Sequence, residues 1–232
     1  MSESVRINKF LAHSIGLSRR EADSAISSGR VTINGRKAVL GATVSSGDHI
    51  ALDGRTVSLK SSYTYILLNK PVGYLSSRRS QGGVPTIYDL ILPKYNALKP
   101  VGRLDKNSSG LLLLTDDGNF AHRMTHPSFH KVKIYEVMLD KPLQPLHQQM
   151  ISDYGVRLDD GVSKFLVENT NPEDQDRKEI VYQVTMSEGR NRQIRRTFAA
   201  LGYTVTSLHR TTFGPYNLAG LNPGKFTITS VK

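Results

Sequence analysis

Apolar residues at helical spacing open the chain. Ile7, Phe10, Leu11 and Ile15 would fall on one face of a helix, and Gly16 follows them as a stop signal. This pattern predicts a short amphipathic helix near the start of the chain.

A second helix is predicted to begin after Ser18. The spacing of Ser18 and Glu21 is that of a capping box, in which the hydroxyl accepts a hydrogen bond from the Glu21 N–H and the carboxylate reaches back. Gly29 is positioned to end this helix. Turn signals with alternating apolar residues between them then predict a small hairpin-rich sheet. These turns are Asn34-Gly35, Ser46-Gly47-Asp48 and Asp53-Gly54.

Strand patterns dominate from residue 63 onward. Apolar or alternating runs predict strands at residues 65–68, 111–114, 135–139, 165–167, 180–186 and 226–231. Helices are predicted at residues 120–124, 143–152 and 192–201. The acidic stretch at residues 171–176 is typical of an exposed hairpin loop. Together these elements predict an α+β domain with a mixed, mainly antiparallel sheet.

A short polar segment separates the two patterns. We therefore predict a small αα-β domain at residues 1–60, a linker at 61–64 and a larger domain at 65–232. A hydrophobic content of 38% supports ordinary globular folding of both.

The net charge of +11 indicates a polyanionic partner, which could be RNA, DNA or an anionic membrane surface. The membrane is the weakest of these, because no apolar run approaches the length of a spanning helix and the first residues contain no signal-peptide core. The chain has no cysteine, so it can form neither a disulfide nor a thiolate metal site. We expect a cytoplasmic monomer without an obligate protein partner.

Asp105 is the leading candidate for chemistry. It lies between Arg103 and Lys106 in the segment GRLDKNSSGLLLLTDDG, ahead of a short apolar run. Turn-forming residues after it predict that it sits in a loop where the chain enters a sheet. The flanking cations suit a carboxylate that acts as a nucleophile or proton acceptor. The alternative is a surface aspartate that pairs with its neighbours in a turn.

Three histidines suggest a metal site. His122, His126 and His130 are spaced four residues apart on a possible helix. Pro127 interrupts that helix, however, and no carboxylate lies at a matching offset. We therefore predict no metal.

The segment around Asp105 resembles the catalytic motif of the pseudouridine synthases that modify ribosomal RNA. Three more segments resemble that family's motifs and follow in the family's order: YILLNKPVGY at residues 65–74, KIY at 133–135 and EGRNRQIRR at 188–196. Two departures are mild, Ser108 where the family usually has threonine and Thr197 where it commonly has methionine.

The resemblance implies isomerisation of uridine to pseudouridine without a cofactor. It implies that Asp105 reacts at C1′ or C6, or removes the 2′ proton, and that Tyr135 stacks on the flipped uracil. It also implies that Arg195 pairs with Asp105. The other residues expected to bind substrate are Arg103, Lys133, Arg190, Arg192 and Arg196. The spacing of Arg192, Arg195 and Arg196 puts them on one face of the predicted helix.

The first domain resembles the alpha-L RNA-binding domain, which is shared with a small-subunit ribosomal protein. The resemblance implies two helices and a following loop that bind structured RNA by its phosphates. The basic residues expected to do this are Arg6, Lys9, Arg19, Arg20 and Arg30. We expect the partner to be ribosomal RNA or a ribosomal precursor particle, with the large subunit favoured.

Two other functions fit parts of this pattern. The chain could be a non-catalytic RNA-binding factor in ribosome assembly, although intact Asp105, Tyr135 and Arg195 argue against this. It could also be an RNA nuclease or a base-excising glycosylase that uses Asp105. Those enzymes leave shortened RNA or an abasic site, whereas isomerisation leaves neither.

Overall fold

The structure, a computed structural model, describes residues 4–60, 62–170 and 181–232. The chain divides into two compact units, Met1–Thr64 with Asp116–Gly118, and Tyr65–Thr115 with Asn119–Lys232. Two features of the sequence prediction, the acidic stretch 171–176 and the strand start at residue 180, lie outside the described residues.

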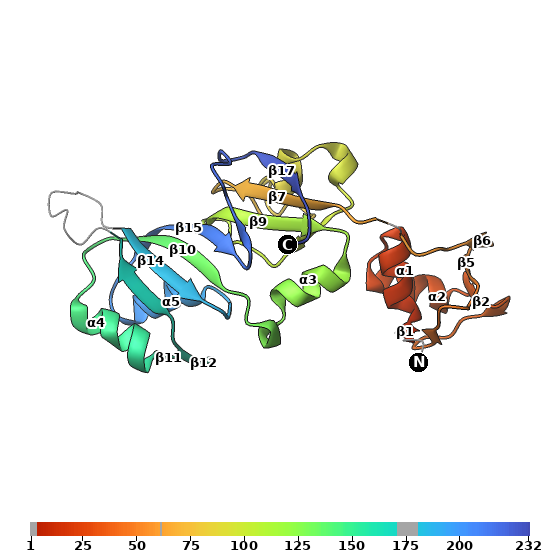
Figure 1. Cartoon of the computed structure of the whole chain (residues 1–232), viewed down its shortest axis with the longest axis horizontal. Coiled ribbons are helices and arrows are strands. Elements are labelled where there is room, and N and C mark those ends of the chain that lie inside the picture. The colour runs from red at the N-terminus through yellow and green to blue at the C-terminus, as the bar shows by residue number, and fades with distance from the viewer. Residues whose placement is uncertain (1–3, 61, 171–180) are drawn as a thin grey trace. The chain divides into compact units, whose positions relative to one another are not determined.

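Two short helices form the first unit's helical layer, α1 (Ile7–Ile15) and α2 (Arg19–Ser27) (Figure 1). Gly16 ends α1 in the left-handed conformation with φ 79°, as its position predicted. The capping box of α2 is also confirmed, because Ser18 Oγ accepts from the Glu21 N–H at 3.1 Å and the Ser18 N–H donates to the Glu21 carboxylate at 2.6 Å. Leu11 and Ala22 pack these helices on one core.

Short strands complete the first unit, and the predicted turns Asn34-Gly35 and Asp53-Gly54 close hairpins, whereas Ser46-Gly47-Asp48 joins two strands that do not pair. They are β1 (Val5–Arg6), β2 (Val31–Ile33), β3 (Arg36–Lys37), β4 (Thr43–Val44), β5 (Ile50–Leu52) and β6 (Arg55–Thr56). Among the described residues, β1 pairs with β4, and the other four form a sheet in the order β3-β2-β5-β6. Asn34 and Asp53 begin two of the turns with φ 51°, a conformation that suits the Asn-Gly and Asp-Gly pairs.

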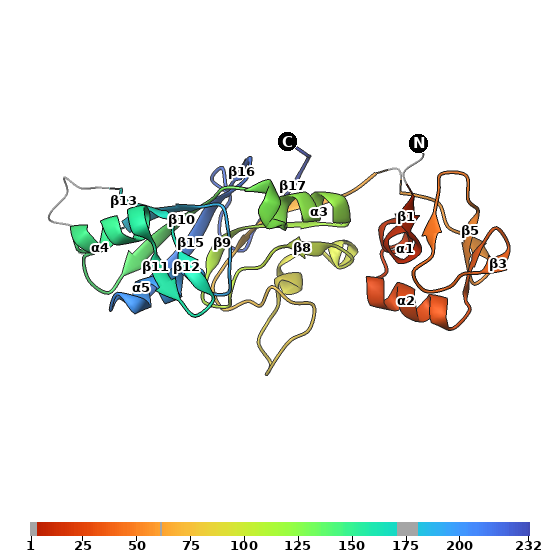
Figure 2. The same ribbon diagram turned by 90° about the horizontal axis from the view of Figure 1, so that it is seen from below.

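One mixed sheet organises the second unit. Its principal strands run in the order β13-β14-β10-β15-β9-β7-β17, with β16 beside β15 and β8 beside β9 (Figures 1 and 2). These strands are β7 (Tyr65–Lys70), β8 (Lys99–Val101), β9 (Ser109–Thr115), β10 (Lys133–Leu139), β13 (Leu166–Asn169), β14 (Val181–Met186), β15 (Val205–Phe213), β16 (Tyr216–Asn217) and β17 (Phe226–Thr229). Most pairs are antiparallel, but β15 runs parallel to β9, so the predicted α+β class is confirmed.

Helices and a small hairpin cover this sheet. The helices are α3 (Gly118–Thr125), α4 (Pro145–Gln149) and α5 (Gln193–Ala200), and a π-helix, η4 (Met150–Tyr154), continues α4. The hairpin consists of β11 (Val156–Leu158) and β12 (Gly161–Ser163), and it lies beside α5 (Figure 2). Short 3₁₀ turns occur at η1 (Ile87–Leu90), η2 (Pro93–Tyr95) and η3 (Pro127–Phe129). No helix in the described part of the chain is long and apolar enough to cross a bilayer.

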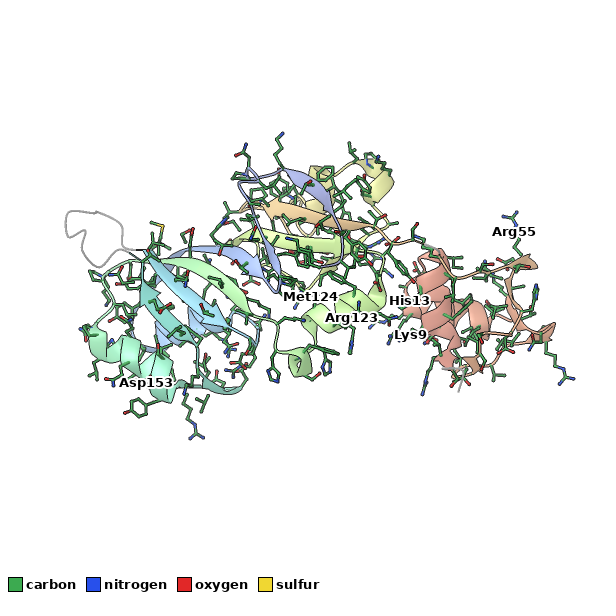
Figure 3. The ribbon with its side chains drawn as sticks, in the orientation of Figure 1. Lys9, His13, Arg55, Arg123, Met124 and Asp153 are labelled. Atoms are coloured by element: carbon green, nitrogen blue, oxygen red, sulfur yellow. The ribbon has the colours of Figure 1, made fainter. Side chains whose placement is uncertain are left out.

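Strand alternation gives the sheet two buried faces. Leu111 and Leu113 pack with Phe120 and Met124 of α3 on one face, and Leu112 and Leu114 join the larger core on the other. Figure 3 labels Met124 and Arg123 on α3; Met124 is buried, whereas Arg123 is exposed.

The sequence prediction missed β15, which lies between β10 and β9 near the middle of the sheet. Its sequence, VTSLHRTTF, contains polar and basic residues at positions that alternation would assign to the core. Leu208 and Phe213 are nevertheless buried, and so is Arg210. β15 forms despite this pattern because β10 and β9 pair with it on its two edges.

Gly110 allows the close approach of β9 to β15. Its φ is 106°, and a Cβ at this position would collide with the backbone of Arg210. We expect Gly110→Ala to lower the free energy of unfolding by about 3 kcal/mol or more, because backbone strain and a steric clash add. Gly224→Ala is the matched control, since Gly224 has φ 77° with nothing within 4 Å, and should cost only about 1–2 kcal/mol. Urea unfolding measures both, and equal costs would contradict the prediction.

Candidate active site

A cavity of about 360 Å³ surrounds Asp105 in the second unit. The loop between β8 and β9, strands β10 and β15, and the segment leading into α5 form its walls. The predicted site residues that line it are Arg103, Asp105, Lys133, Tyr135, Arg190 and Arg192. Arg195 and Arg196 were predicted to join them but do not line the cavity.

Asp105 lies in the loop that precedes β9, as the turn residues predicted. Its carbonyl accepts from the Ser108 N–H at 3.0 Å, which closes a tight turn below the carboxylate. The Asp105 side chain is 39% exposed and faces the cavity. A reacting group from a substrate could therefore reach it without displacing any element of the fold.

Lys70, at the end of β7, supports this loop from inside the protein. The residue is fully buried, and its ammonium donates to the carbonyls of Asp105 at 3.0 Å, Ser108 at 2.7 Å and Pro71 at 3.1 Å. Burial lowers the pKa of Lys70 from 10.5 to about 8, and the charge of Asp105 opposes this shift. Lys70 belongs to the segment 65–74 that resembles a family motif, but no role was predicted for it.

Arg192 makes the ion pair with Asp105. Its Nη1 lies 3.6 Å from Asp105 Oδ2, and both side chains are partly exposed. The pairing expected for Arg195 is therefore wrong in this structure. Arg195 instead donates to the carbonyls of Val205 at 2.7 Å and Asn107 at 2.8 Å, so it ties α5 to β15 and to the loop of Asp105.

Arg195 still lies in the electrostatic field of the site. Burial lowers its pKa most, the charge of Arg192 lowers it further, and the charge of Asp105 raises it. The Arg195 guanidinium therefore binds the carbonyls of Val205 and Asn107, and its charge still interacts with the carboxylate of Asp105.

In the basic motif, residues 188–196, the predicted shared helical face of Arg192, Arg195 and Arg196 does not form. Arg192 precedes the helix in a left-handed conformation, with φ 46° and ψ 32°, so the helical spacing applies only from Gln193 onward. Arg196 points to Asp160 in the turn of the β11–β12 hairpin, and its Nη2 donates to Oδ2 at 2.6 Å. Arg190 also donates to Asp160, at 2.9 Å. Hydrogen bonds from Arg196 lower the pKa of Asp160.

Tyr135 and Lys133 both line the cavity from β10, two residues apart on the same side of the strand. The Tyr135 side chain is largely buried, so its ring position is fixed by packing. The Lys133 ammonium donates to the carbonyls of Ser187 and Glu188, each at 3.2 Å, and it thereby holds the segment that leads to Arg192. Burial and then the charge of Arg210 lower the pKa of Lys133.

Arg210 of β15 also lines the cavity, and no sequence pattern had indicated it. It is only 3% exposed, its Nε donates to the Leu111 carbonyl at 2.8 Å, and its guanidinium lies 4.8 Å from the centre of the Phe213 ring. Gly214-Pro215 forms a turn that ends β15. This turn is the sequence signal that could have indicated β15 and therefore Arg210.

The two departures from the family pattern are both buried. The Ser108 hydroxyl has no hydrogen-bond partner among the described residues. The Thr197 hydroxyl donates to the Gln193 carbonyl at 2.9 Å and lies 2.7 Å from Ser163 Oγ, from which it can accept. Thr197 therefore connects α5 to β12 through a polar contact that methionine could not make.

The predicted RNA-binding residues of the first unit differ in their partners. Arg30 forms a bidentate pair with Asp53, with Nε 2.8 Å from Oδ1. Arg6, Lys9, Arg19 and Arg20 form no ion pair within the described residues. Figure 3 labels Lys9, which extends from α1.

The histidines that suggested a metal pack as aromatic rings. His122 and His126 lie with ring centres 4.7 Å apart, and both contact Phe129. Nδ1 of His126 also caps η3, because it accepts from the Ser128 N–H at 3.3 Å. The described residues contain no group of three or more side chains placed to bind a metal ion.

Comparison with protein-family models gives two matches. Residues 64–200 match the RNA pseudouridylate synthase family, and residues 5–50 match the S4 domain. The first region contains Asp105, Tyr135 and Arg192, and the second contains both helices of the first unit.

Individual proteins are similar over nearly the whole chain. The ribosomal large subunit pseudouridine synthase B of Bacillus subtilis is 35% identical over 94% of this chain and 89% of that protein. The ribosomal small subunit pseudouridine synthase A of Pasteurella multocida is 38% identical over 92% and 90%, respectively. A crystal structure of a pseudouridylate synthase aligns with a TM-score of 0.68 at 31% identity, and it covers 97% of this chain and 96% of that one.

The buried ammonium of Lys70 gives a pH-dependent prediction. Between pH 8 and 10.5 the unfolded chain still binds this proton while the folded protein has released it, so stability rises with pH. We expect the free energy of unfolding of the wild type to rise by about 2 kcal/mol relative to Lys70→Met between pH 8 and 10. Lys106→Met, at an exposed lysine in the same loop, should follow the wild type. A difference between wild type and Lys70→Met that stays constant over this range would contradict the prediction.

Proposed function

Because this chain belongs to the RNA pseudouridylate synthase family, with an S4 domain before the synthase domain, we propose that it isomerises a specific uridine of ribosomal RNA. The observation that carries the proposal is the position of Asp105 in a cavity lined by Tyr135 and Arg192, within the region that matches the family. Its volume of about 360 Å³ lies in the range of small-ligand pockets, roughly 300–1,000 Å³.

Isomerisation requires the target base to leave the RNA stack. The N1–C1′ bond breaks, the uracil turns, and C5 bonds to C1′; the proton lost from C5 is balanced by the one gained at N1. Base, sugar and enzyme must stay together throughout, so the base is expected to enter the cavity. Tyr135 supplies a packed aromatic wall on which it can stack.

Asp105 supplies the reacting oxygen. Attack at C1′, attack at C6 and removal of the 2′ proton all use the same carboxylate at the cavity wall. Arg192 holds that carboxylate from the solvent side, and Lys70 holds its backbone from the protein side. Arg103 is exposed beside it and is suited to bind the target's phosphate or to fill the space left by the flipped base.

The first unit is proposed to bind RNA by its phosphates. Arg6, Lys9, Arg19 and Arg20 lack acidic partners among the described residues, so they can release counterions when they contact RNA. Arg30 is expected to contribute less, because Asp53 already neutralises it.

The proposed domains are residues 1–60 and 65–232, with a linker at 61–64, and residues 116–118 group with the first unit. The partner is then ribosomal RNA or a precursor particle, and the enzyme is a cytoplasmic monomer that needs no cofactor.

Mapping of pseudouridines tests the proposal directly. Carbodiimide-stop primer extension across both ribosomal RNAs, in cells with and without the gene, should show one stop that depends on the gene. A large-subunit site is expected, and a small-subunit site would move the assignment to the other subunit. Absence of any dependent stop would favour a non-catalytic assembly factor, and shortened or abasic RNA would favour a nuclease or glycosylase.

Asp105→Asn should abolish product formation. The amide preserves shape but removes the anionic oxygen, so the single-turnover rate should fall by at least about a thousandfold. Affinity for RNA should stay within a few fold. Asp153→Asn, at an exposed carboxylate on η4 (Figure 3), is the control and should keep wild-type activity. Turnover of Asp105→Asn within tenfold of wild type would remove Asp105 from the reaction.

Arg19→Ala and Arg20→Ala should weaken RNA binding without changing the saturated rate. Each lost phosphate contact should reduce the slope of log affinity against log salt by about 1. Arg30→Ala, which removes an already neutralised arginine, should change the slope less. Binding across a salt series measures this, and equal slopes for all variants and the wild type would refute phosphate binding by these residues.

A further inference from the structure

The β11–β12 hairpin carries Asp160, whose carboxylate accepts hydrogen bonds from Arg190 and Arg196 of the basic motif. Asp160 lies in the turn of this hairpin, after Asp159. Arg196 donates to both carboxylate oxygens, at 3.1 and 2.6 Å, and Arg190 donates to Oδ1 at 2.9 Å. Arg190 also donates to the carbonyls of Asp160 at 3.1 Å and Val162 at 2.9 Å. Both arginines are thus bound to the hairpin.

Arg190 and Arg196, once held by Asp160, make further hydrogen bonds that fix the backbone on both sides of Arg192. Before it, the Asn191 carbonyl accepts from Arg196 Nε at 2.9 Å. After it, the Gln193 side chain accepts from the Arg190 N–H at 3.0 Å and donates to Ser163 Oγ at 3.1 Å. Gln193 also donates to the Glu188 carboxylate.

Arg192 itself adopts a conformation that few residues other than glycine favour. Its φ of 46° and ψ of 32° are left-handed, and such a conformation persists only where the surroundings hold it. This turn directs the Arg192 guanidinium to within 3.6 Å of Asp105. A regular helical conformation at this position would point the side chain elsewhere.

We propose that Asp160 is a positioning residue, which holds Arg192 in place beside Asp105 by anchoring Arg190 and Arg196. The proposal rests on the proposed function, because it assigns the arginines on Asp160 to the assembly of that active site. It replaces the expectation that Arg190 and Arg196 bind substrate. The competing interpretation is that RNA phosphates displace Asp160 from these arginines.

Asp160→Asn and its neighbour Asp159→Asn form a matched pair. Both remove one negative charge from the same exposed turn, and Asp159 makes no ion pair among the described residues. We expect Asp160→Asn to lower the single-turnover rate at saturating RNA by about ten- to a hundredfold, because misplacement of a catalytic neighbour by about 1 Å has effects of this size. Asp159→Asn should keep the wild-type rate, and Asp160→Glu should recover most of it. Equal rates for Asp160→Asn and Asp159→Asn would overturn the proposal.

Binding separates the two interpretations. If Asp160 only positions Arg192, the slope of log affinity against log salt is the same in Asp160→Asn and Asp159→Asn. If the arginines instead bind phosphates in competition with Asp160, Asp160→Asn binds RNA more tightly, with a steeper slope than Asp159→Asn and an undiminished rate. That result would overturn the positioning role.

A double-mutant cycle tests whether Asp160 acts through Arg192. In an Arg192→Met background, the further change Asp160→Asn should alter the rate less than twofold. Independent effects, in which the two losses multiply, would refute the connection.

A spectroscopic readout separates this proposal from the proposed function. The NMR signal of the Arg192 Nε–H, assigned by its loss in Arg192→Met, should shift in Asp105→Asn and in Asp160→Asn but not in Asp159→Asn. An unchanged signal in Asp160→Asn would refute positioning whatever the activity. If the wild type makes no pseudouridine, the proposed function fails, while the NMR comparison still decides the role of Asp160.

Discussion

The buried ammonium of Lys70, which binds the loop of Asp105, is the constraint on which the site depends. Lys70 donates to three carbonyls, and two of them lie in the turn that carries Asp105. The loop of Asp105 is therefore fixed to the end of β7 and is not free to move on its own. Strand register extends this support: Lys70 lies opposite Gly110, Gly110 opposite Arg210, and Arg210 opposite Tyr135. One row of residues across four strands thus connects Lys70, which supports the loop, to Tyr135, which lines the cavity. The desolvation of Lys70 is the cost of this arrangement, and it appears as the lowered pKa.

The four arginines of the basic motif have different partners in the structure. Arg192 faces Asp105, Arg195 bonds backbone carbonyls, and Arg190 and Arg196 bind Asp160. An arginine-rich segment in an RNA-modifying enzyme is therefore not simply a phosphate-binding surface. Guanidinium groups with several fixed donors are well suited to join loops, because one side chain can satisfy two or three carbonyl or carboxylate oxygens at once.

Under the proposed function, RNA affinity and chemistry belong to different units of the chain. The first unit offers basic side chains without acidic partners among its described residues, whereas the cations around the cavity are mostly committed to the fold. This separation fits a reaction that needs one precisely held nucleotide and a long RNA. In that proposal, phosphate contacts would supply affinity without reading sequence, and the cavity would act only on a base that can enter it.

The sequence by itself determined the local elements and pointed to Asp105 as the candidate reactive group. Helix caps at Ser18 and Gly16 and the loop of Asp105 are set by neighbours within a few residues, so pattern and propensity suffice. The tertiary structure decided β15 and Arg210, the role of Lys70, and which arginine meets Asp105. Each of these depends on residues far apart in the chain: β15 is fixed by strands on both sides, and Arg192 is turned toward Asp105 by a loop bound to Asp160. Helical spacing predicted one shared face for the arginines, but the left-handed turn at Arg192 lies before the helix, where that spacing does not apply.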